Sequence, residues 1–337
     1  MKDRMNALFC AFHAKDRMLR FLDDFPEINW TVTQTPAEAA AAIGMAHIVV
    51  LNNRICTPEL GAALRSSPSP DLLWIHFITA GVERGLAMGL PPGVPVTNAA
   101  GANGPALAEH AFALLLGCMR RFNDIFQAQA ARSWRRLEIS AKMRGLEGSR
   151  VCIIGLGAVG REIARKLRAF DVDVIAISRS GNDSNVSAVY PRERLCEAFH
   201  QSDAVIVCTN SDPSSYHLIG EAEIAALKPG SFIVNVARGE IIDENALIES
   251  LKSGHIAGAG LDVTEEEPLP PDNSLWTLPC VILSPHVAGG GAGEGGYRRQ
   301  KDLFAANLQR LEKRQTLLSL VDTASTAQVP VTETRPP

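Results

Sequence analysis

The chain has 337 residues, of which 46% are hydrophobic and 21% charged, with a formal net charge of −4 at pH 7. This composition is typical of a folded globular protein, and the length predicts about two domains. The small acidic excess excludes a global positive field of the kind that attracts nucleic acid or acidic membranes.

The first hundred residues alternate short apolar runs with helical patterns. Helices are predicted at 16–25 and 36–44, and proline- and glycine-rich loops at 66–71 and 89–95. Strands separated by helices predict a parallel sheet with both faces covered. The predicted strands are 6–12, 31–35, 47–52, 72–78 and 94–98.

One long helix is predicted from Ala106 to Arg132, with Pro105 at its entry, because apolar residues recur there at three- and four-residue spacing. Such a length is unusual inside a globular domain. The pattern leaves three interpretations open, namely a core helix, a bridge between two domains and a subunit interface.

The alternation begins again at Arg150 and predicts a second parallel sheet with its own helices. A further helix is predicted at 297–314. Strands are predicted at 151–155, 172–178, 204–210, 231–237, 258–263 and 281–286, with helices at 158–170, 192–199, 220–227 and 245–254.

The first strand of this second sheet leads into a G-x-G-x-x-G motif. Gly155 would form the tight turn, Gly157 would let the backbone approach a pyrophosphate, and Gly160 would let helix and strand pack closely. The backbone N–H groups of Ala158 and Val159 would face the phosphates at the positive end of the helix. A strand–helix turn without a ligand is the alternative, and the complete strand, turn, helix and strand context favours a dinucleotide site.

Eighteen residues after Gly160, the next strand ends at Ser178, where an NAD site would place an acidic residue on the ribose. Ser178 removes the repulsion that such an acid exerts on the 2′-phosphate of NADP. Arg179 offers that phosphate a planar cation, and Ser180 adds a hydroxyl. The sequence therefore predicts that NADP, as NADPH, is preferred over NAD. The alternative is that Arg179 is a solvated loop residue.

Three polar residues stand at the ends of later strands: Arg238 before Gly239, Glu267 before Pro268, and His286 before a glycine-rich loop. Taken singly, such residues are more often structural or solvated than catalytic. Ligands of open parallel sheets bind outside the carboxyl ends of the strands. Their shared placement beside a nucleotide motif therefore favours the hydride, proton and carboxylate chemistry of 2-keto acid reduction.

These features occur within longer segments that together resemble the D-2-hydroxyacid dehydrogenase family, whose members are NAD(P)-dependent enzymes that reduce 2-keto acids. The resemblance covers most of the chain between about residues 45 and 310. The matching segments are "TAGVERGL", "NGPALAEHAFALLL", "IIGLGAVGREIA", "LKPGSFIVNVARGEIIDENAL", "GAGLDVTEEEPLP" and "SPHVAGG".

The resemblance implies a catalytic role for each of the three polar residues. Arg238 would bind the carbonyl and carboxylate of the substrate and stabilise the developing alkoxide. His286 would donate the proton, and Glu267 would hydrogen-bond this histidine and favour its protonated form.

The resemblance also implies binding residues. The backbone N–H groups of Ala80, Gly81 and Val82 would hold the substrate carboxylate. Asn210 stands where the family usually has a proline, in a loop that lines the cofactor. Further cofactor contacts are implied for Cys208, Asn210, Ala237 and, on the nicotinamide side, Asp262. From their loops, Asn53, Arg54 and Arg84 are candidate substrate contacts or solvated residues.

The family fold implies an α/β protein with two doubly wound parallel-sheet domains, a Rossmann cofactor domain inserted into a flavodoxin-like substrate domain. The substrate domain would comprise residues 1–100 and 291–322, and the dinucleotide-binding domain residues 101–290. Crossings near residues 101 and 290 would let a cleft close. Residues 323–337 form a polar tail that we expect to be disordered. The long helix commonly contributes to a homodimer in the family.

The leading hypothesis is a reductase that converts a small 2-keto acid, such as glyoxylate or hydroxypyruvate, into the D-2-hydroxy acid with NADPH. One alternative is a non-catalytic, dinucleotide-sensing regulator of the same fold. Another is a dehydrogenase for a different substrate, such as a bulkier 2-keto acid, a phosphoglycerate or an inorganic oxyanion.

Seven dispersed cysteines without a C-x-x-C pair predict free thiols in a reducing compartment. We expect no signal peptide, and the sequence shows no apolar stretch long enough to span a bilayer and no metal-ligand spacing. We therefore expect a cytoplasmic protein without a metal, a membrane partner or a nucleic-acid partner.

Overall fold

The computed structural model describes residues 4–10, 16–66, 69, 71–179 and 181–323. Ser180 and nearly all of the predicted disordered tail lie outside these residues. The chain folds into two compact units, one built from the residues up to Asn103 together with those from Gly293 onward, the other from Gly104–Ala292. Among the described residues, no helix combines the length and the apolar character that crossing a bilayer requires.

The first unit contains a five-stranded parallel sheet in the order β2-β1-β3-β4-β5, which is the flavodoxin-like order. Its strands are β1 (Asn6–Cys10), β2 (Asn29–Thr33), β3 (Ile48–Leu51), β4 (Trp74–Phe77) and β5 (Val96–Asn98). Its helices are α1 (Asp16–Asp23), α2 (Pro36–Ala42), α3 (Pro58–Ser66), α4 (Glu83–Ala87) and α12 (Gly293–Glu312), with short 3-10 turns at Ile43–Met45 and Asn53–Ile55.

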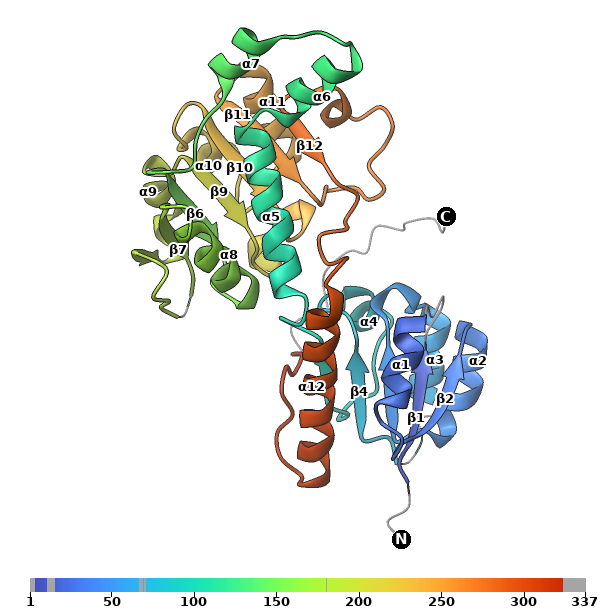
Figure 1. Cartoon of the computed structure of the whole chain (residues 1–337). Helices are drawn as coiled ribbons and strands as arrows, with labels where there is room; N and C mark the ends of the chain where they lie inside the picture. The colour runs from blue at the N-terminus through green and yellow to red at the C-terminus, as the bar shows by residue number, and fades with distance from the viewer. Residues whose placement is uncertain (1–3, 11–15, 67–68, 70, 180, 324–337) are drawn as a thin grey trace. The chain divides into compact units, whose positions relative to one another are not determined.

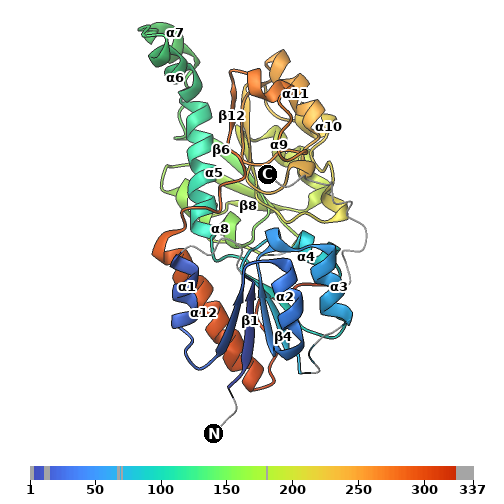
Figure 2. The same cartoon turned by 90° about the vertical axis from the view of Figure 1, so that its right-hand side faces the viewer.

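Successive residues of a strand point to opposite faces of its sheet, and this separates two apolar cores in the first unit. Leu8 packs in one core with Leu60 of α3, and Phe9 packs in the other with Phe304 of α12. Figure 2 shows α2 and α3 on one side of these strands and α1 and α12 on the other. Both faces are therefore covered, as predicted for buried parallel strands.

The second unit contains a seven-stranded parallel sheet in the order β12-β11-β10-β9-β6-β7-β8. The direction of strand addition reverses between β6 and β9, which makes this the switch point where doubly wound sheets bind ligands. Its strands are β6 (Arg150–Ile154), β7 (Asp173–Ile177), β8 (Ala188–Tyr190), β9 (Ala204–Val207), β10 (Ser231–Asn235), β11 (Ile256–Leu261) and β12 (Val281–Leu283).

Helices cover both faces of this second sheet. In Figure 1, α5 runs along one face, where it packs against α8 and against β10 and β11. The helices are α5 (Gly104–Met119), α6 (Phe122–Ala130), α7 (Arg136–Lys142), α8 (Ala158–Arg168), α9 (Leu195–His200), α10 (Glu221–Ala225) and α11 (Glu244–Ser253), with 3-10 turns at Arg192–Arg194, Pro213–Ser215, Gly239–Ile241 and Ser274–Thr277. The predicted fold class of two parallel α/β sheets is thus confirmed.

The prediction of one continuous helix from Ala106 to Arg132 is wrong. Helix α5 ends at Met119, and Arg121 adopts a left-handed backbone conformation with φ 59° before α6 begins. Hydrogen bonds to distant segments hold this break, since the Arg121 side chain donates to the Ala257 carbonyl at 3.1 Å and Asn123 donates to the Val281 carbonyl. The apolar periodicity continues through the break, and so it gave no signal of it.

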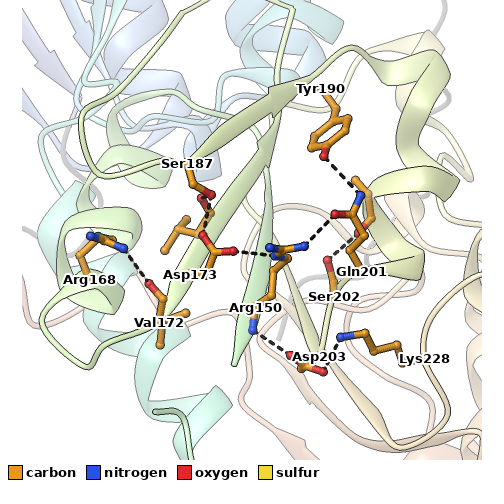
Figure 3. A network of polar contacts seen from close by, with 12 residues as sticks. Arg150, Arg168, Val172, Asp173, Ser187, Tyr190, Gln201, Ser202, Asp203 and Lys228 are labelled. Atoms are coloured by element: carbon orange, nitrogen blue, oxygen red, sulfur yellow. Dashed lines mark hydrogen bonds and ion pairs between the residues drawn. The ribbon is translucent and has the colours of Figure 1, made fainter. Parts of the chain in front are cut away.

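A polar network joins the amino-terminal ends of β6, β7 and β9 (Figure 3). The Arg150 side chain donates to Asp173 at 2.6 Å and to Gln201 at 2.7 Å, while its backbone N–H donates to Asp203 at 2.8 Å. Lys228 reaches the second oxygen of Asp203 at 2.8 Å. The network therefore fixes the edge of the sheet opposite to the carboxyl ends where a ligand would bind.

Candidate active site

The turn from β6 into α8 is built from three glycines whose surroundings differ. Gly155 has φ 100°, a backbone conformation that residues with a side chain rarely adopt. A Cβ on this residue would lie 2.7 Å from the Thr209 Cα. A Cβ on Gly160 would lie 2.0 Å from the Gly155 oxygen, whereas one on Gly157 would meet nothing within 4 Å. The turn is thus closely packed behind and open at Gly157, where α8 begins. That open space beside a helix amino terminus fits the pyrophosphate of a dinucleotide.

Cys208 lies at the end of β9, against the back of this turn. Its thiol contacts the Gly155 carbonyl at 3.2 Å, and burial raises the pKa of the thiol to about 12. Such a thiol is neutral at physiological pH and acts as a small packing group. In the following loop, Asn210 is exposed.

The end of β7 carries the residues predicted to read the ribose. The backbone N–H of Ser178 donates to the Tyr190 carbonyl at 3.1 Å, which continues the pairing of β7 with β8. The Arg179 side chain is 83% exposed, and its Nη2 lies 3.7 Å from the Asp212 carboxylate. A hydrogen bond from the Ser214 hydroxyl is the main cause that lowers the pKa of Asp212, and Arg179 and Arg192 add to this effect. The end of β7, where the ribose is predicted to bind, therefore carries the accessible guanidinium of Arg179 with the Asp212 carboxylate beside it.

The three predicted catalytic residues follow neighbouring strands. Arg238 follows β10, Glu267 follows β11, and His286 follows β12, and these strands pair in parallel so that Asn235 faces Leu261 and Leu261 faces Leu283. The Nδ1 of His286 lies 2.7 Å from the Glu267 Oε2, and both side chains are more than a third exposed. Because a carboxylate can only accept, Nδ1 carries the proton of this bond and Nε2 is left facing elsewhere.

Two further features support the turn that carries Arg238. The buried Asn235 accepts from the Ala237 N–H at 3.0 Å and donates to the Arg238 carbonyl at 2.8 Å. A Cβ on Gly239 would lie 2.0 Å from the backbone of Thr264, so only glycine allows this close approach. The loops that carry Arg238 and Glu267 are thus packed against each other. Ala237 itself is buried at the start of the turn.

Asp262 is almost completely buried and holds the segment around His286. Its Oδ1 accepts from the Ser284 hydroxyl at 2.5 Å and from the Val287 N–H at 2.9 Å. Its Oδ2 accepts from the Ala288 N–H at 2.9 Å. Both carboxylate oxygens thus bind the protein itself, and a contact from Asp262 to nicotinamide stays a prediction.

The predicted substrate loop belongs to the first unit, between β4 and α4. The Asn98 side chain donates to the Ala80 carbonyl at 2.6 Å, and the Thr79 hydroxyl donates to the Gly81 carbonyl at 2.8 Å. Val82 is buried and precedes α4. The Asn53 side chain, a candidate substrate contact, accepts from the Gly85 N–H at 3.0 Å and so supports this loop.

Sequence reasoning missed the residues that hold the predicted ones in place, namely Asn235, Ser284 and His110. The first two stand within quoted segments, Asn235 three positions before Arg238 and Ser284 two positions before His286. His110 stands within the quoted segment "NGPALAEHAFALLL". Nothing in the sequence paired it with Ser284, which is 174 residues away in the chain.

Comparisons with known proteins extend over most of the chain. Residues 112–288 match the family model described as D-isomer specific 2-hydroxyacid dehydrogenase, NAD binding domain. The glyoxylate reductase of Korarchaeum cryptofilum (strain OPF8) is 33% identical over 236 residues, which cover 68% of this chain and 70% of that protein.

Two solved structures resemble both the fold and the sequence. A D-isomer specific 2-hydroxyacid dehydrogenase family protein from Aeromonas salmonicida subsp. salmonicida A449 has a TM-score of 0.81 at 28% identity, covering 95% of this chain and 99% of its own. A D-isomer specific 2-hydroxyacid dehydrogenase from Xanthobacter autotrophicus Py2, in complex with NADPH and MES, has a TM-score of 0.79 at 26% identity, covering 94% of this chain and 98% of its own.

Proposed function

The chain belongs to the D-isomer specific 2-hydroxyacid dehydrogenase family, and we propose that it reduces a small 2-keto acid to the D-2-hydroxy acid with NADPH. The observation that carries this proposal is the pair formed by His286 and Glu267, 2.7 Å apart, beside the turn that presents Arg238. An imidazole held by a carboxylate is the general acid that reduction of a carbonyl requires.

The proposed mechanism assigns one task to each group. A bound nicotinamide cofactor supplies the hydride that reaches the carbonyl carbon of the keto acid. Arg238 binds the keto acid and stabilises negative charge as it develops on the carbonyl oxygen. His286 holds a proton on Nε2 and gives it to that oxygen. Glu267 orients the ring through Nδ1 and stabilises its charged form until the proton leaves.

The cofactor preference rests on the end of β7. Ser178 replaces the acid that would repel a 2′-phosphate, and the exposed Arg179 supplies a cation for it. The similar protein from Xanthobacter autotrophicus Py2 is in complex with NADPH. We therefore propose NADPH in preference to NADH, with the phosphate replacing the Asp212 carboxylate beside Arg179.

The substrate class rests on the curated relative, which is a glyoxylate reductase. We propose glyoxylate or hydroxypyruvate as the keto acid, with its carboxylate held by Arg238. A bulkier keto acid stays the alternative substrate within the same chemistry.

We further propose that the enzyme is a cytoplasmic homodimer. Figure 2 shows α6 and α7 beyond the end of α5. This region carries exposed apolar side chains, among them Trp134 in the loop between the two helices, at 93% exposure, and Leu137 of α7, at 82%. Apolar surface of this kind is typical of protein interfaces. All seven cysteines are free, as in a reducing compartment. Sedimentation of the native protein tests the dimer, and Trp134→Ser together with Leu137→Ser would yield monomers.

Initial rates with NADPH and NADH over a panel of 2-keto acids of increasing size test the function directly. We expect turnover with glyoxylate or hydroxypyruvate, and a kcat/KM higher with NADPH. In Arg179→Ala that preference would fall by about tenfold to a hundredfold, because hydrogen bonds to charged groups contribute about 1.5–3 kcal/mol. A wild-type protein that uses NADH better would contradict the cofactor proposal.

The catalytic assignment has its own test. His286→Ala and Arg238→Ala would each lower kcat by about a hundredfold or more, while the folded structure is retained. His200→Ala is a matched control, since this exposed histidine ends α9, away from the strand ends that carry the site. Binding of NADPH by the wild type without turnover of any keto acid would instead support the dinucleotide-sensing alternative.

A further inference from the structure

The segment that carries His286 is anchored to one buried carboxylate on both sides of the histidine. Before it, the Ser284 hydroxyl contacts Asp262 Oδ1, and after it, the Val287 and Ala288 N–H groups contact the two oxygens of Asp262. The N–H of His286 itself donates to the Asp262 carbonyl at 2.8 Å. The position of the imidazole therefore depends on the position of this carboxylate.

The backbone of His286 needs such anchoring. Its φ is 53°, in the left-handed region that non-glycine residues rarely occupy. A conformation of this kind persists only where the surrounding structure enforces it. The contacts of Ser284, Val287 and Ala288 with Asp262 provide that enforcement on both sides of the histidine.

A second histidine completes this arrangement from helix α5. The Nε2 of His110 lies 2.8 Å from the Ser284 Oγ and 3.3 Å from Asp262 Oδ1. At 2.5 Å from Asp262 Oδ1, the Ser284 hydroxyl must use its single hydrogen on that carboxylate. The Ser284 hydroxyl can therefore only accept from His110. This fixes the donor of each hydrogen bond: His110 Nε2–H donates to Ser284, and Ser284 donates to Asp262.

We infer that His110 and Ser284 are positioning residues for the proton donor His286. This inference rests on the proposed function, since it assigns the two residues to the same reaction. His110 orients the Ser284 hydroxyl, Ser284 holds Asp262, and Asp262 holds the segment on either side of His286. Neither residue needs to touch substrate. Their loss would displace the imidazole and leave Arg238, which belongs to a different loop, in place.

Two variants at residue 110 separate hydrogen bonding from packing. His110→Phe keeps the ring volume but removes the donor, whereas His110→Gln places an amide N–H near the position of Nε2. With NADPH and glyoxylate, we expect kcat of His110→Phe to fall about two- to tenfold, the scale of one lost hydrogen bond. We expect an unchanged KM for glyoxylate and recovery of most of the rate in His110→Gln. Equal rates in both variants would overturn the inference.

A double-mutant cycle tests whether His110 and Ser284 act through the same series of hydrogen bonds. Ser284→Ala removes the hydroxyl that receives the His110 donor, so the loss of kcat in the double variant Ser284→Ala, His110→Phe would be smaller than the product of the two single losses, even though His110 also lies near Asp262. The effects of substitutions within one hydrogen-bond network are not additive. Independent, multiplicative losses of kcat in the double variant would contradict the proposed order of contacts.

A readout without turnover keeps the inference separate from the proposed function. Hydrogen exchange of a peptide that covers residues 284–290 reports on the Val287 and Ala288 amides. It would be faster in His110→Phe than in the wild type and in His110→Gln, with the peptide over β6 unchanged. Unchanged exchange at 284–290 would overturn the positioning role. Absence of keto acid turnover in the wild type would instead contradict only the proposed function.

Discussion

His286 Nδ1 lies 2.7 Å from Glu267 Oε2, although the two residues follow different strands of the second sheet and are separated by 19 positions in the chain. The strands that precede them, β11 and β12, are neighbours in parallel register. Parallel pairing brings their carboxyl ends to the same edge, and this makes the contact possible.

Glu267→Gln removes the negative charge while an amide oxygen can still accept from Nδ1. We expect kcat for keto acid reduction to fall about tenfold to a hundredfold, because a hydrogen bond to a charged group is worth about 1.5–3 kcal/mol. Steady-state kinetics with NADPH measure this. Glu266→Gln, one position earlier and exposed, is the matched control and would retain the wild-type rate. Equal rates for Glu267→Gln and the wild type would remove Glu267 from the mechanism.

The glycine turn offers a contrast between two substitutions of the same kind. Gly160→Ala places a Cβ 2.0 Å from the Gly155 oxygen, so the turn must shift, and we expect a loss of about 1–3 kcal/mol in the free energy of unfolding. Gly157→Ala meets no protein atom within 4 Å. We expect its free energy of unfolding to lie within about 0.5 kcal/mol of the wild-type value. We expect it to bind NADPH more weakly, since the new methyl group occupies the proposed pyrophosphate position.

Urea unfolding and NADPH fluorescence titration of both glycine variants measure these effects. The prediction requires that stability falls mainly in Gly160→Ala and that cofactor affinity falls in Gly157→Ala. Unchanged NADPH affinity in Gly157→Ala would place the pyrophosphate elsewhere.

The Asp173 carboxylate makes the stability of the second unit depend on pH. The hydrogen bond from Ser187 is the main cause that lowers the pKa of this carboxyl in the folded protein, and Arg150 adds to it. A group whose folded pKa is lowered stabilises the fold above its unfolded pKa and loses this contribution as pH falls through the folded pKa. We therefore expect Asp173→Asn to cost about 1 kcal/mol near pH 7 and progressively less below about pH 4. Thermal unfolding of both proteins from pH 7 to pH 3 measures this, and a difference independent of pH would contradict it.

The buried thiols should resist alkylation in the native protein. Burial raises the pKa of Cys10, Cys118 and Cys208 to about 12, so that only about one thiol in ten thousand is ionised at pH 8. Cys196 is half-buried, and we expect it to react first with iodoacetamide. Mass spectrometry of peptides from native and urea-treated protein gives the order of labelling. Early labelling of Cys208 would show that the glycine turn opens readily.

Much of the fold could be predicted because buried parallel strands are short, nearly continuous apolar runs. All five strands of the first sheet and six of the seven of the second were predicted in this way. The seventh, β8, escaped detection because its three residues are only half-buried. Helices α3, α4 and α7 also escaped, and the break at Arg121 was missed because distant carbonyls, not local sequence, hold it.

The sequence by itself determined the residue types and their order: glycines where a strand turns into a helix, Ser178 and Arg179 at the next strand end, and Arg238, Glu267 and His286 after later strands. These follow from local rules, since turn geometry and strand ends depend on neighbours in the chain. Only the tertiary structure decided that His110, Ser284 and Asp262 meet at the His286 segment. A hydrogen bond depends on distance and direction in space, and a contact across 174 positions exists only once helix α5 has packed against the sheet.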